Sequence, residues 1–248
     1  MNGVHIWFDA RLAVDRFLNG VQMKTARTKG EATREHVLTS ALGLFRKRGF
    51  ERTTMRDIAQ AAELSLGAAY HSFPSKDALV QAYYEWMQAE HERLAQAATT
   101  APDADLKTRI STLLETKLEL LRRDRKLLAA LFGNLGDPAH PLSIFGKKTS
   151  ALRQRSIAQF VAIFDDRGIP EELRVVLGRA LWLAHLGVFL FFIHDRSPKQ
   201  VRTRKLAEAV VELVASGVPL LSHPLAAPIR GRLLELVANL EPAQEAKS

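Results

Sequence analysis

Cysteine is absent from the 248-residue chain. Disulfides, thiolate metal sites and cysteine nucleophiles are therefore excluded, and a chain without thiols suits a reducing cytoplasm. Long apolar runs are missing too: the longest, residues 180–193, has fourteen residues, whereas a membrane-spanning helix needs about 20. Asp9 and Asp15 interrupt the N-terminal segment, which argues against a secretory signal. We expect a cytoplasmic protein with no membrane partner.

The common signatures of catalysis are also lacking. Neither HExxH nor GxSxG occurs, and the eight histidines show no ligand spacing paired with carboxylates. Residues 146–150 (GKKTS) resemble part of a phosphate-binding loop, but Pro141 stands where the motif needs glycine and Lys148 where it needs Ser or Thr. We predict no enzyme activity, no metal and no cofactor; a helical enzyme is the alternative hypothesis.

Alternating strand patterns are not found. Between the prolines, apolar residues recur at helical spacing nearly everywhere, which predicts an all-α fold. We expect an N-terminal three-helix unit over residues 23–76, joined to a helical ligand-binding and dimerisation domain over residues 77–240. The expected helices lie near residues 31–48, 54–62, 65–71, 75–98, 103–122, 125–134, 142–166, 171–195, 199–217 and 228–240.

The two ends of the chain differ from the rest. Met23 opens a segment that is typical of a natural start, so we interpret residues 1–22 as a weakly ordered extension. A short accessory helix is the alternative for these residues, because several of them are apolar. The polar tail, residues 241–248, is predicted to fray.

Positive charge is concentrated in one part of the chain. The net charge is +8, and residues 23–76 contribute +5 of it, from 10 Lys or Arg and 5 Asp or Glu. Such a concentration favours a polyanionic partner, although a solvated basic surface would look the same in the sequence.

Local helix signals in this basic segment follow one another closely. The first helix should bury the apolar stripe Val37, Leu38, Ala41, Leu44 and Phe45. Thr54 and Asp57 form a capping-box pattern at the start of a second, short helix. After a break at residues 63–64, Ser65 can cap a third helix. Helix, short helix, tight turn and short helix is the layout that places the last helix in the major groove of DNA.

The segment FRKRGFERTTMRDIAQAAELSLGAAYHSFPSKDALV resembles the DNA-binding domain of the TetR family of transcription regulators. The resemblance covers about residues 30–80. It implies a homodimer that binds a near-palindromic double-stranded operator, with a helical domain that dimerises and encloses a small-molecule pocket. The matching elements are Gly49-Phe50, Thr53-Thr54, Ile58-Ala59, Ser65-Leu66-Gly67, Tyr70-His71, Phe73 and the run from Ser75 to Leu79.

The resemblance also implies which residues contact DNA. Lys76 matches the family's phosphate-binding lysine, and its place at a helix N-terminus independently favours an anion. His71 is alternatively an ordinary exposed histidine, and Arg56 a surface ion-pair partner. Residues before the first helix are candidates for a minor-groove arm, namely Lys24, Arg27 and Lys29. The DNA-binding candidates are Thr54, Arg56, Ser65, Leu66, Gly67, Ala68, Tyr70, His71 and Lys76.

Three positions depart from the family pattern. Glu63 stands where the turn usually carries glycine, and Leu66 and Ala68 stand where lysine and threonine are common. We expect apolar side chains at these last two positions to contact thymine methyl groups or no base at all, rather than to hydrogen-bond a base. The operator sequence therefore stays open.

The second half of the chain predicts a dimer interface and a pocket. The helix over residues 171–195 is apolar all round from residue 180 to residue 193, and the next helix is amphipathic, so we expect both to pack against a second copy. Aromatic residues in this half of the chain suggest a pocket for a largely apolar ligand with one acceptor or acid, and three of the candidates share one face of the helix over residues 171–195. A core aromatic stripe around a hydrogen-bonded histidine is the alternative. The pocket candidates are Phe132, Phe145, Trp182, His185 and Phe189.

These observations predict a repressor that a small, largely apolar ligand releases from its operator. A DNA-binding dimer that responds to no ligand is the alternative.

Overall fold

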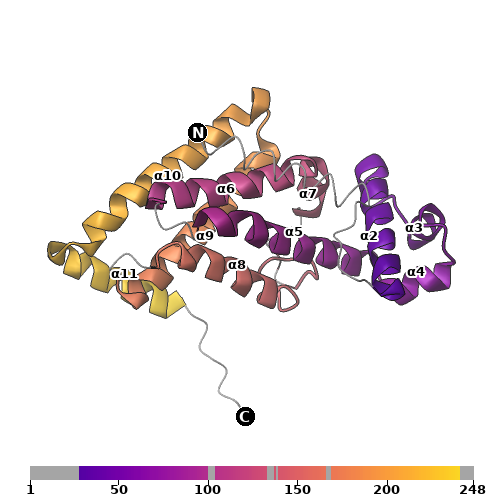
Figure 1. The fold of residues 1–248 in the computed structure, drawn as a ribbon, viewed down its shortest axis with the longest axis horizontal. Coiled ribbons are helices and arrows are strands. Elements are labelled where there is room, and N and C mark those ends of the chain that lie inside the picture. The colour runs from indigo at the N-terminus through magenta and orange to yellow at the C-terminus, as the bar shows by residue number, and fades with distance from the viewer. Residues whose placement is uncertain (1–27, 100–103, 133–136, 138, 166–168, 241–248) are drawn as a thin grey trace, which may run out of the picture.

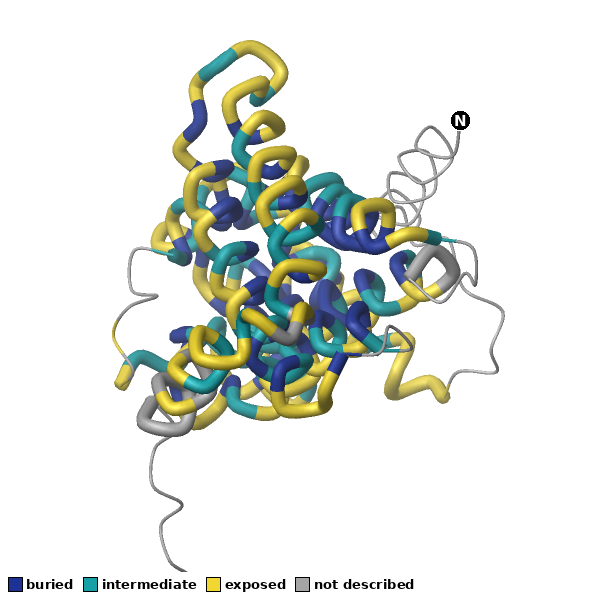
Figure 2. The backbone as a smooth tube through the Cα atoms, turned by 90° about the vertical axis from the view of Figure 1, so that its left-hand side faces the viewer, coloured by how far each residue is buried: buried dark blue, intermediate teal, exposed yellow. Residues whose placement is uncertain are grey.

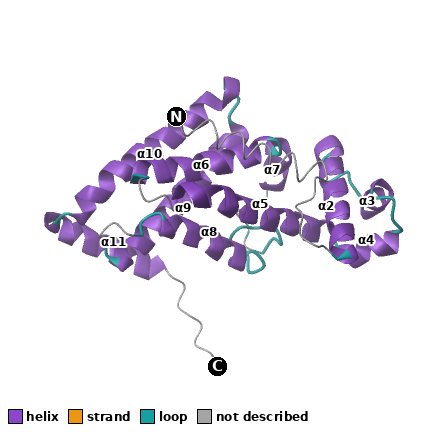
Figure 3. Cartoon of the chain, viewed as in Figure 1, coloured by secondary structure: helices purple, strands orange, loops and turns teal. Residues whose placement is uncertain are grey.

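The computed structural model describes residues 28–99, 104–132, 137, 139–165 and 169–240. Over these residues the chain consists of helices joined by turns, without a strand (Figure 3). The all-α prediction is therefore confirmed. The expected extension at residues 1–22, the arm residues Lys24 and Arg27, and the tail at residues 241–248 lie outside the described residues.

Three helices form one end of the molecule (Figure 1). The first begins at Thr28, whose hydroxyl accepts the Glu31 N–H at 3.2 Å in a capping box. It ends at Gly49, which takes a φ of 87° that a residue with a Cβ adopts only at a cost. These helices are α2 (Lys29–Arg48), α3 (Met55–Ala61) and α4 (Leu66–Ser72).

A long helix leads from this end into the rest of the protein. It is α5 (Lys76–Thr99), and it packs against α6 on one side and α8 on the other, while α9 crosses behind it (Figure 1). The remaining helices are α6 (Leu106–Arg122), α7 (Arg125–Leu131), α8 (Ser150–Ala162), α9 (Glu171–His194), α10 (Val201–Ser222) and α11 (Ala227–Leu240), with 3₁₀ turns at Pro198–Gln200 and Pro224–Ala226.

The buried apolar side chains fall into two clusters. Figure 2 shows that the buried positions lie on the inward sides of the helices. One cluster joins α2, α3 and α4 to the first half of α5, to α7 and to the C-terminal part of α9. The other lies between α6, α8, α9 and α10. At the crossing of α8 and α9, a Cβ on Gly178 would lie 2.7 Å from the Val161 Cα, so only glycine permits this approach. The three-helix end thus shares a core with α5, α7 and α9.

Three details differ from the expectations. The segment 142–149, expected to be helical, forms turns, because the Arg153 guanidinium and the Thr149 hydroxyl bond the carbonyls of Ile144 (2.7 Å) and Gly146 (3.2 Å). Helix α10 continues through Pro219 to Ser222 instead of ending near residue 217. In α2, Leu42 is buried, whereas Leu44 is only half-buried.

Helix α9 was expected to be covered on every side. By length and composition alone it could cross a membrane, but half of its most apolar stretch is buried inside the protein, as in a core helix. The other face is open to solvent and carries Leu183, Gly187, Leu190 and Phe191 at helical spacing. A single copy of the chain therefore leaves an apolar stripe of α9 uncovered.

Candidate DNA-binding surface and internal cavity

The start of α3 is held by a reciprocal cap. The Thr54 hydroxyl accepts the Asp57 N–H at 3.2 Å and donates to the Asp57 carboxylate at 2.6 Å. The hydrogen bonds from Thr54 and the charge of Arg48 lower the pKa of Asp57. The predicted capping box is confirmed. It also means that the hydroxyl of Thr54, a DNA-binding candidate, is already engaged within the protein.

The turn between α3 and α4 depends on Glu63. This residue has a φ of 54°, in the left-handed region that favours glycine. Its neighbour Leu64 donates its N–H to the Ala59 carbonyl at 2.9 Å, which closes the turn. The turn of the motif is therefore made here without the usual glycine.

Helix α4 presents its first residues to solvent. The Ser65 hydroxyl accepts the Ala68 N–H at 3.2 Å and caps the helix, and Ala69 packs inward without exposure. Leu66 is 37% exposed and Tyr70 48% exposed, so both large side chains are accessible to a binding partner. The candidates that lie on the exposed side of α3 and α4 are Arg56, Ser65, Leu66, Gly67, Tyr70 and His71, while Ala68 is half-buried.

Two lysine candidates have different surroundings. Lys29 is exposed in the first turn of α2. The Lys76 ammonium donates to the Phe50 carbonyl at 2.8 Å and lies 4.3 Å from the centre of the Phe50 ring. Lys76 therefore ties the start of α5 to the segment after α2, a role that sequence reasoning missed. A phosphate contact would use the remaining hydrogen-bonding capacity of the ammonium.

A cavity of about 120 Å³, partly open to solvent, lies between α5, α6, α7, α8 and α9. Four of the five pocket candidates line it: Phe132, Trp182, His185 and Phe189. The fifth, Phe145, is not among its lining residues and is 46% exposed, because the segment 142–149 forms turns rather than a helix. The rings of Phe132 and Phe189 meet edge to face with centroids 4.5 Å apart.

The polar lining includes residues that the sequence analysis missed. The Lys117 side chain donates to the Gln88 amide oxygen at 3.2 Å, and its burial lowers its pKa to about 8. A signal for Lys117 was present, because it occupies an inward position in the buried stripe Leu113, Leu114, Leu120 and Leu121. A lysine inside an apolar helical stripe is unusual and marks a candidate functional group.

Two further polar groups in the cavity lack partners. Neither ring nitrogen of His185 meets hydrogen-bond geometry with any described residue, and the same holds for the buried Tyr84 hydroxyl. Burial, followed by the charge of Lys117, lowers the pKa of His185 to about 3, and the Trp182 main chain opposes this shift only slightly. Burial raises the pKa of Tyr84. Both groups are therefore neutral near pH 7.

Two family models match most of the chain. The model for bacterial regulatory proteins of the tetR family matches residues 37–83. The model for the tetracyclin repressor-like C-terminal domain matches residues 109–227.

Curated relatives match shorter stretches of the chain. The transcriptional regulator TtgR of Pseudomonas putida is 41% identical over 81 residues, which are 32% of this chain and 39% of TtgR. The transcriptional repressor KstR2 of Mycolicibacterium smegmatis is 32% identical over 71 residues, 27% of this chain and 35% of KstR2. The chain thus spans less than half the length of these relatives.

Solved structures share the fold over nearly their whole length. A tetR-family regulator of Streptomyces coelicolor aligns with a TM-score of 0.53 and 23% identity, over 87% of this chain and 92% of that one. The fatty acid degradation regulator FadR of Bacillus halodurans aligns with a TM-score of 0.56 and 14% identity, over 79% of this chain and 98% of FadR.

Proposed function

The chain belongs to the TetR family of bacterial regulatory proteins, and from this premise we propose that it is a dimeric repressor that a small ligand releases from its DNA. The observation that carries the proposal is the capped, exposed α4, which presents Leu66 and Tyr70 to solvent at one end of the molecule. We further propose that the protein acts in the cytoplasm and has no catalytic activity.

DNA recognition is assigned to α3 and α4. Helix α4 enters the major groove with Ser65, Leu66 and Gly67 foremost, while Arg56 and Tyr70 reach bases or phosphates from either side. The exposed Lys29, together with the preceding basic residues, follows the minor groove. Leu66 supplies contact with thymine methyl groups, so we expect an operator whose half-sites carry thymine or adenine at that position.

Dimerisation is assigned to α9 and α10. The open stripe of α9 carries Leu183, Leu190 and Phe191, and α10 adds Leu213 and Leu220, which are 75% and 70% exposed. Apolar surface of this extent on two neighbouring helices supports burial against the same helices of a second copy. Two copies related in this way present two α4 helices, which a near-palindromic operator requires.

A buried polar chain supports communication between the cavity and the DNA-binding end. Tyr83 lines the cavity, and its hydroxyl donates to the Asp124 carboxylate at 2.6 Å. The same carboxylate accepts a 3.0 Å hydrogen bond from the Arg46 guanidinium of α2. A ligand in the cavity would then favour one position of α2, and an operator bound at α4 would favour another. Ligand binding therefore lowers the affinity for DNA, because ligand and operator bind different states of the protein.

Fluorescence anisotropy tests the function directly. The purified protein is titrated into the duplex upstream of its own gene and into a scrambled duplex, at low and at physiological salt. A preference for the upstream duplex that survives salt supports sequence-specific binding, whereas equal affinities that vanish with salt indicate phosphate contacts alone. The variant is Tyr70→Ala on α4, and its control is Phe145→Ala, because Phe145 is similarly exposed but lies in the turns before α8.

A further inference from the structure

Lys117 is a buried cation with almost no acceptors. It is only 8% exposed, and the Gln88 amide oxygen, 3.2 Å away, is its one hydrogen-bond acceptor among the described residues. The nearby Glu92 carboxylate is occupied, since it accepts from Arg155 at 2.6 Å and from Gln88 at 3.1 Å. An ammonium has three N–H donors, so most of the donor capacity of Lys117 is unused.

Unpaired buried charge has a cost that a ligand of opposite charge can remove. Burial of Lys117 lowers its pKa to about 8, yet the group still carries its proton at neutral pH. An anion beside the ammonium would restore the interaction that water provides to an exposed lysine. The site therefore gains more from an anion than from any neutral or cationic ligand.

Among the described residues, the charged side chains that line the cavity are all positive. The described residues that line the cavity include two cations, Lys117 and Arg153, and no Asp or Glu. The Arg153 guanidinium already donates a hydrogen bond to the Ile144 carbonyl at 2.7 Å, so Lys117 is the better anchor for an anion. One anchoring ammonium matches one negative charge, whereas a doubly charged phosphate would also need Arg153, whose guanidinium already donates to the carbonyls of Ile144 and Gly146.

Neutral donors line the same cavity. The Tyr84 hydroxyl and the His185 ring are more than nine-tenths buried and have no partner among the described residues. The charge of Lys117 acts on the His185 ring, so these two groups lie within electrostatic range of each other. A carboxylate has two oxygens that accept several hydrogen bonds, and can therefore satisfy an ammonium together with a hydroxyl or an imidazole N–H.

Most of the remaining lining is apolar. Side chains such as Met87, Leu121, Phe132 and Phe189 surround this space. A volume of about 120 Å³ is close to that of the ~150 Å³ engineered cavity that accepts benzene. The body of the ligand is therefore apolar: one aromatic ring fits within this volume, and a second ring can extend toward the open side of the cavity.

We infer that this cavity binds a small amphipathic carboxylic acid, with its carboxylate on Lys117 and its apolar body among the aromatic side chains. The inference rests on the proposed function only in treating the cavity as the effector site. Binding itself can be measured without DNA.

Isosteric ligands that differ only in charge provide the test. Benzoate, benzamide and benzamidine, and the three matching 1-naphthyl compounds, are titrated into the full chain by isothermal calorimetry and thermal unfolding. We expect at least one carboxylate to bind at least tenfold more tightly than its amide, and the amidines not to bind. In Lys117→Met the carboxylate should lose at least tenfold in affinity, while the amide changes by less than about threefold.

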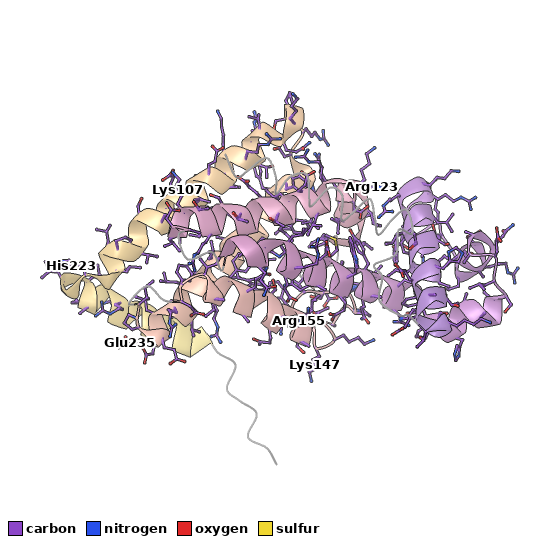
Figure 4. All side chains as sticks on the ribbon, in the orientation of Figure 1. Lys107, Arg123, Lys147, Arg155, His223 and Glu235 are labelled. Atoms are coloured by element: carbon purple, nitrogen blue, oxygen red, sulfur yellow. The ribbon has the colours of Figure 1, made fainter. Side chains whose placement is uncertain are left out.

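Lys107→Met is the control, because Lys107 lies on the same helix at the outer edge beside α10 and pairs with Glu212 there (Figure 4). It should keep the preference of the unaltered protein. Amides or amidines that bind as tightly as the carboxylates, a preference that survives Lys117→Met, or no carboxylate binding up to 10 mM would each overturn the inference. A protein that binds the acids but no DNA refutes the proposed function alone, and one that binds its operator but is indifferent to ligand charge refutes this inference alone.

Discussion

In the α2–α4 unit, the side chains that cap the helices find partners three residues away, whereas the buried polar groups Lys117, His185 and Tyr84 of the cavity depend on another helix or have no partner among the described residues. Thr28 with Glu31, Thr54 with Asp57, and Ser65 with the Ala68 N–H are all pairs of the first kind. Lys117, His185 and Tyr84 belong to the second kind. The local pairs hold the starts of the three helices in one conformation, which suits a surface that binds DNA. The unsatisfied polar groups in the cavity can still form hydrogen bonds with a ligand.

The open apolar stripe of α9 belongs to neither region, and no described part of the same copy of the chain covers it. Phe191→Glu places a charge on this stripe, so we expect dissociation to monomers and about 100-fold weaker operator binding. Light scattering measures the first effect and anisotropy the second. Phe145→Glu is the matched control, because Phe145 is similarly exposed, 46% against 41%, but lies in the turns before α8. A Phe191→Glu protein that remains dimeric would refute the assigned interface.

The tie between the two regions is Asp124, which is 2% exposed and bonds both Arg46 and Tyr83. Asp124→Asn leaves the Arg46 charge without its partner, so we expect a loss of about 3 kcal/mol in the free energy of unfolding. Tyr83→Phe, which removes only the hydroxyl, should cost about 1 kcal/mol. Urea unfolding at a fixed protein concentration measures both. Glu90→Gln, at the surface pair with Arg93, should change stability by less than about 0.5 kcal/mol; an equal loss there would show that burial of the pair is not the cause.

At Lys117 we expect removal of the charged group to increase stability, whereas the changes at Asp124 and Tyr83 lower it. Its pKa of about 8 lies below the unfolded value near 10.4, so the folded state binds fewer protons between these values and its stability rises with pH there. The cost of the buried charge is fully present below pH 8. We therefore expect Lys117→Met to stabilise the unliganded protein by about 2 kcal/mol at pH 7, and by progressively less toward pH 10. Thermal unfolding across this range checks the trend, and a pH-independent difference would contradict it.

The affinity for a carboxylate should depend on whether the Lys117 side chain carries its proton. A bound carboxylate raises the pKa of Lys117, so affinity for benzoate or 1-naphthoate should be constant below pH 8 and fall up to tenfold per pH unit above it. The groups that interact with Lys117 are Gln88, His91 and the ion-paired Glu92 on α5 and His185 on α9, while Arg153 on α8 lines the same cavity. Burial lowers the pKa of both His91 and His185, so neither gains charge in this range. Calorimetry at pH 6 to 10 gives the profile, which should be flat in Lys117→Met.

The contrast between the regions also explains what the sequence could predict. The starts of α3 and α4 follow from caps within three residues, and Trp182, His185 and Phe189 share a face of α9 through helical periodicity alone. The other walls of the cavity come from α5, α6 and α8, and no local pattern pairs Lys117 with Gln88, 29 residues earlier. The turns at residues 142–149 depend on Arg153, which bonds backward to Ile144 across nine residues. The segment that contains Phe145 therefore forms turns instead of the predicted helix.

The smallest expected effect concerns the one strained residue in the locally satisfied region. Glu63 has a φ of 54° in the turn between α3 and α4, where a Cβ costs about 1 kcal/mol, and glycine removes that cost but adds freedom to the unfolded chain. We expect Glu63→Gly to stabilise the protein by about 0.5 kcal/mol and Glu63→Ala, which keeps the Cβ, not to stabilise it. Because the turn keeps its conformation in Glu63→Gly, operator affinity should change by less than about twofold. Chemical unfolding and anisotropy on the same samples separate the two effects, and weaker DNA binding by a more stable Glu63→Gly would mean that the glutamate itself takes part in placing α4.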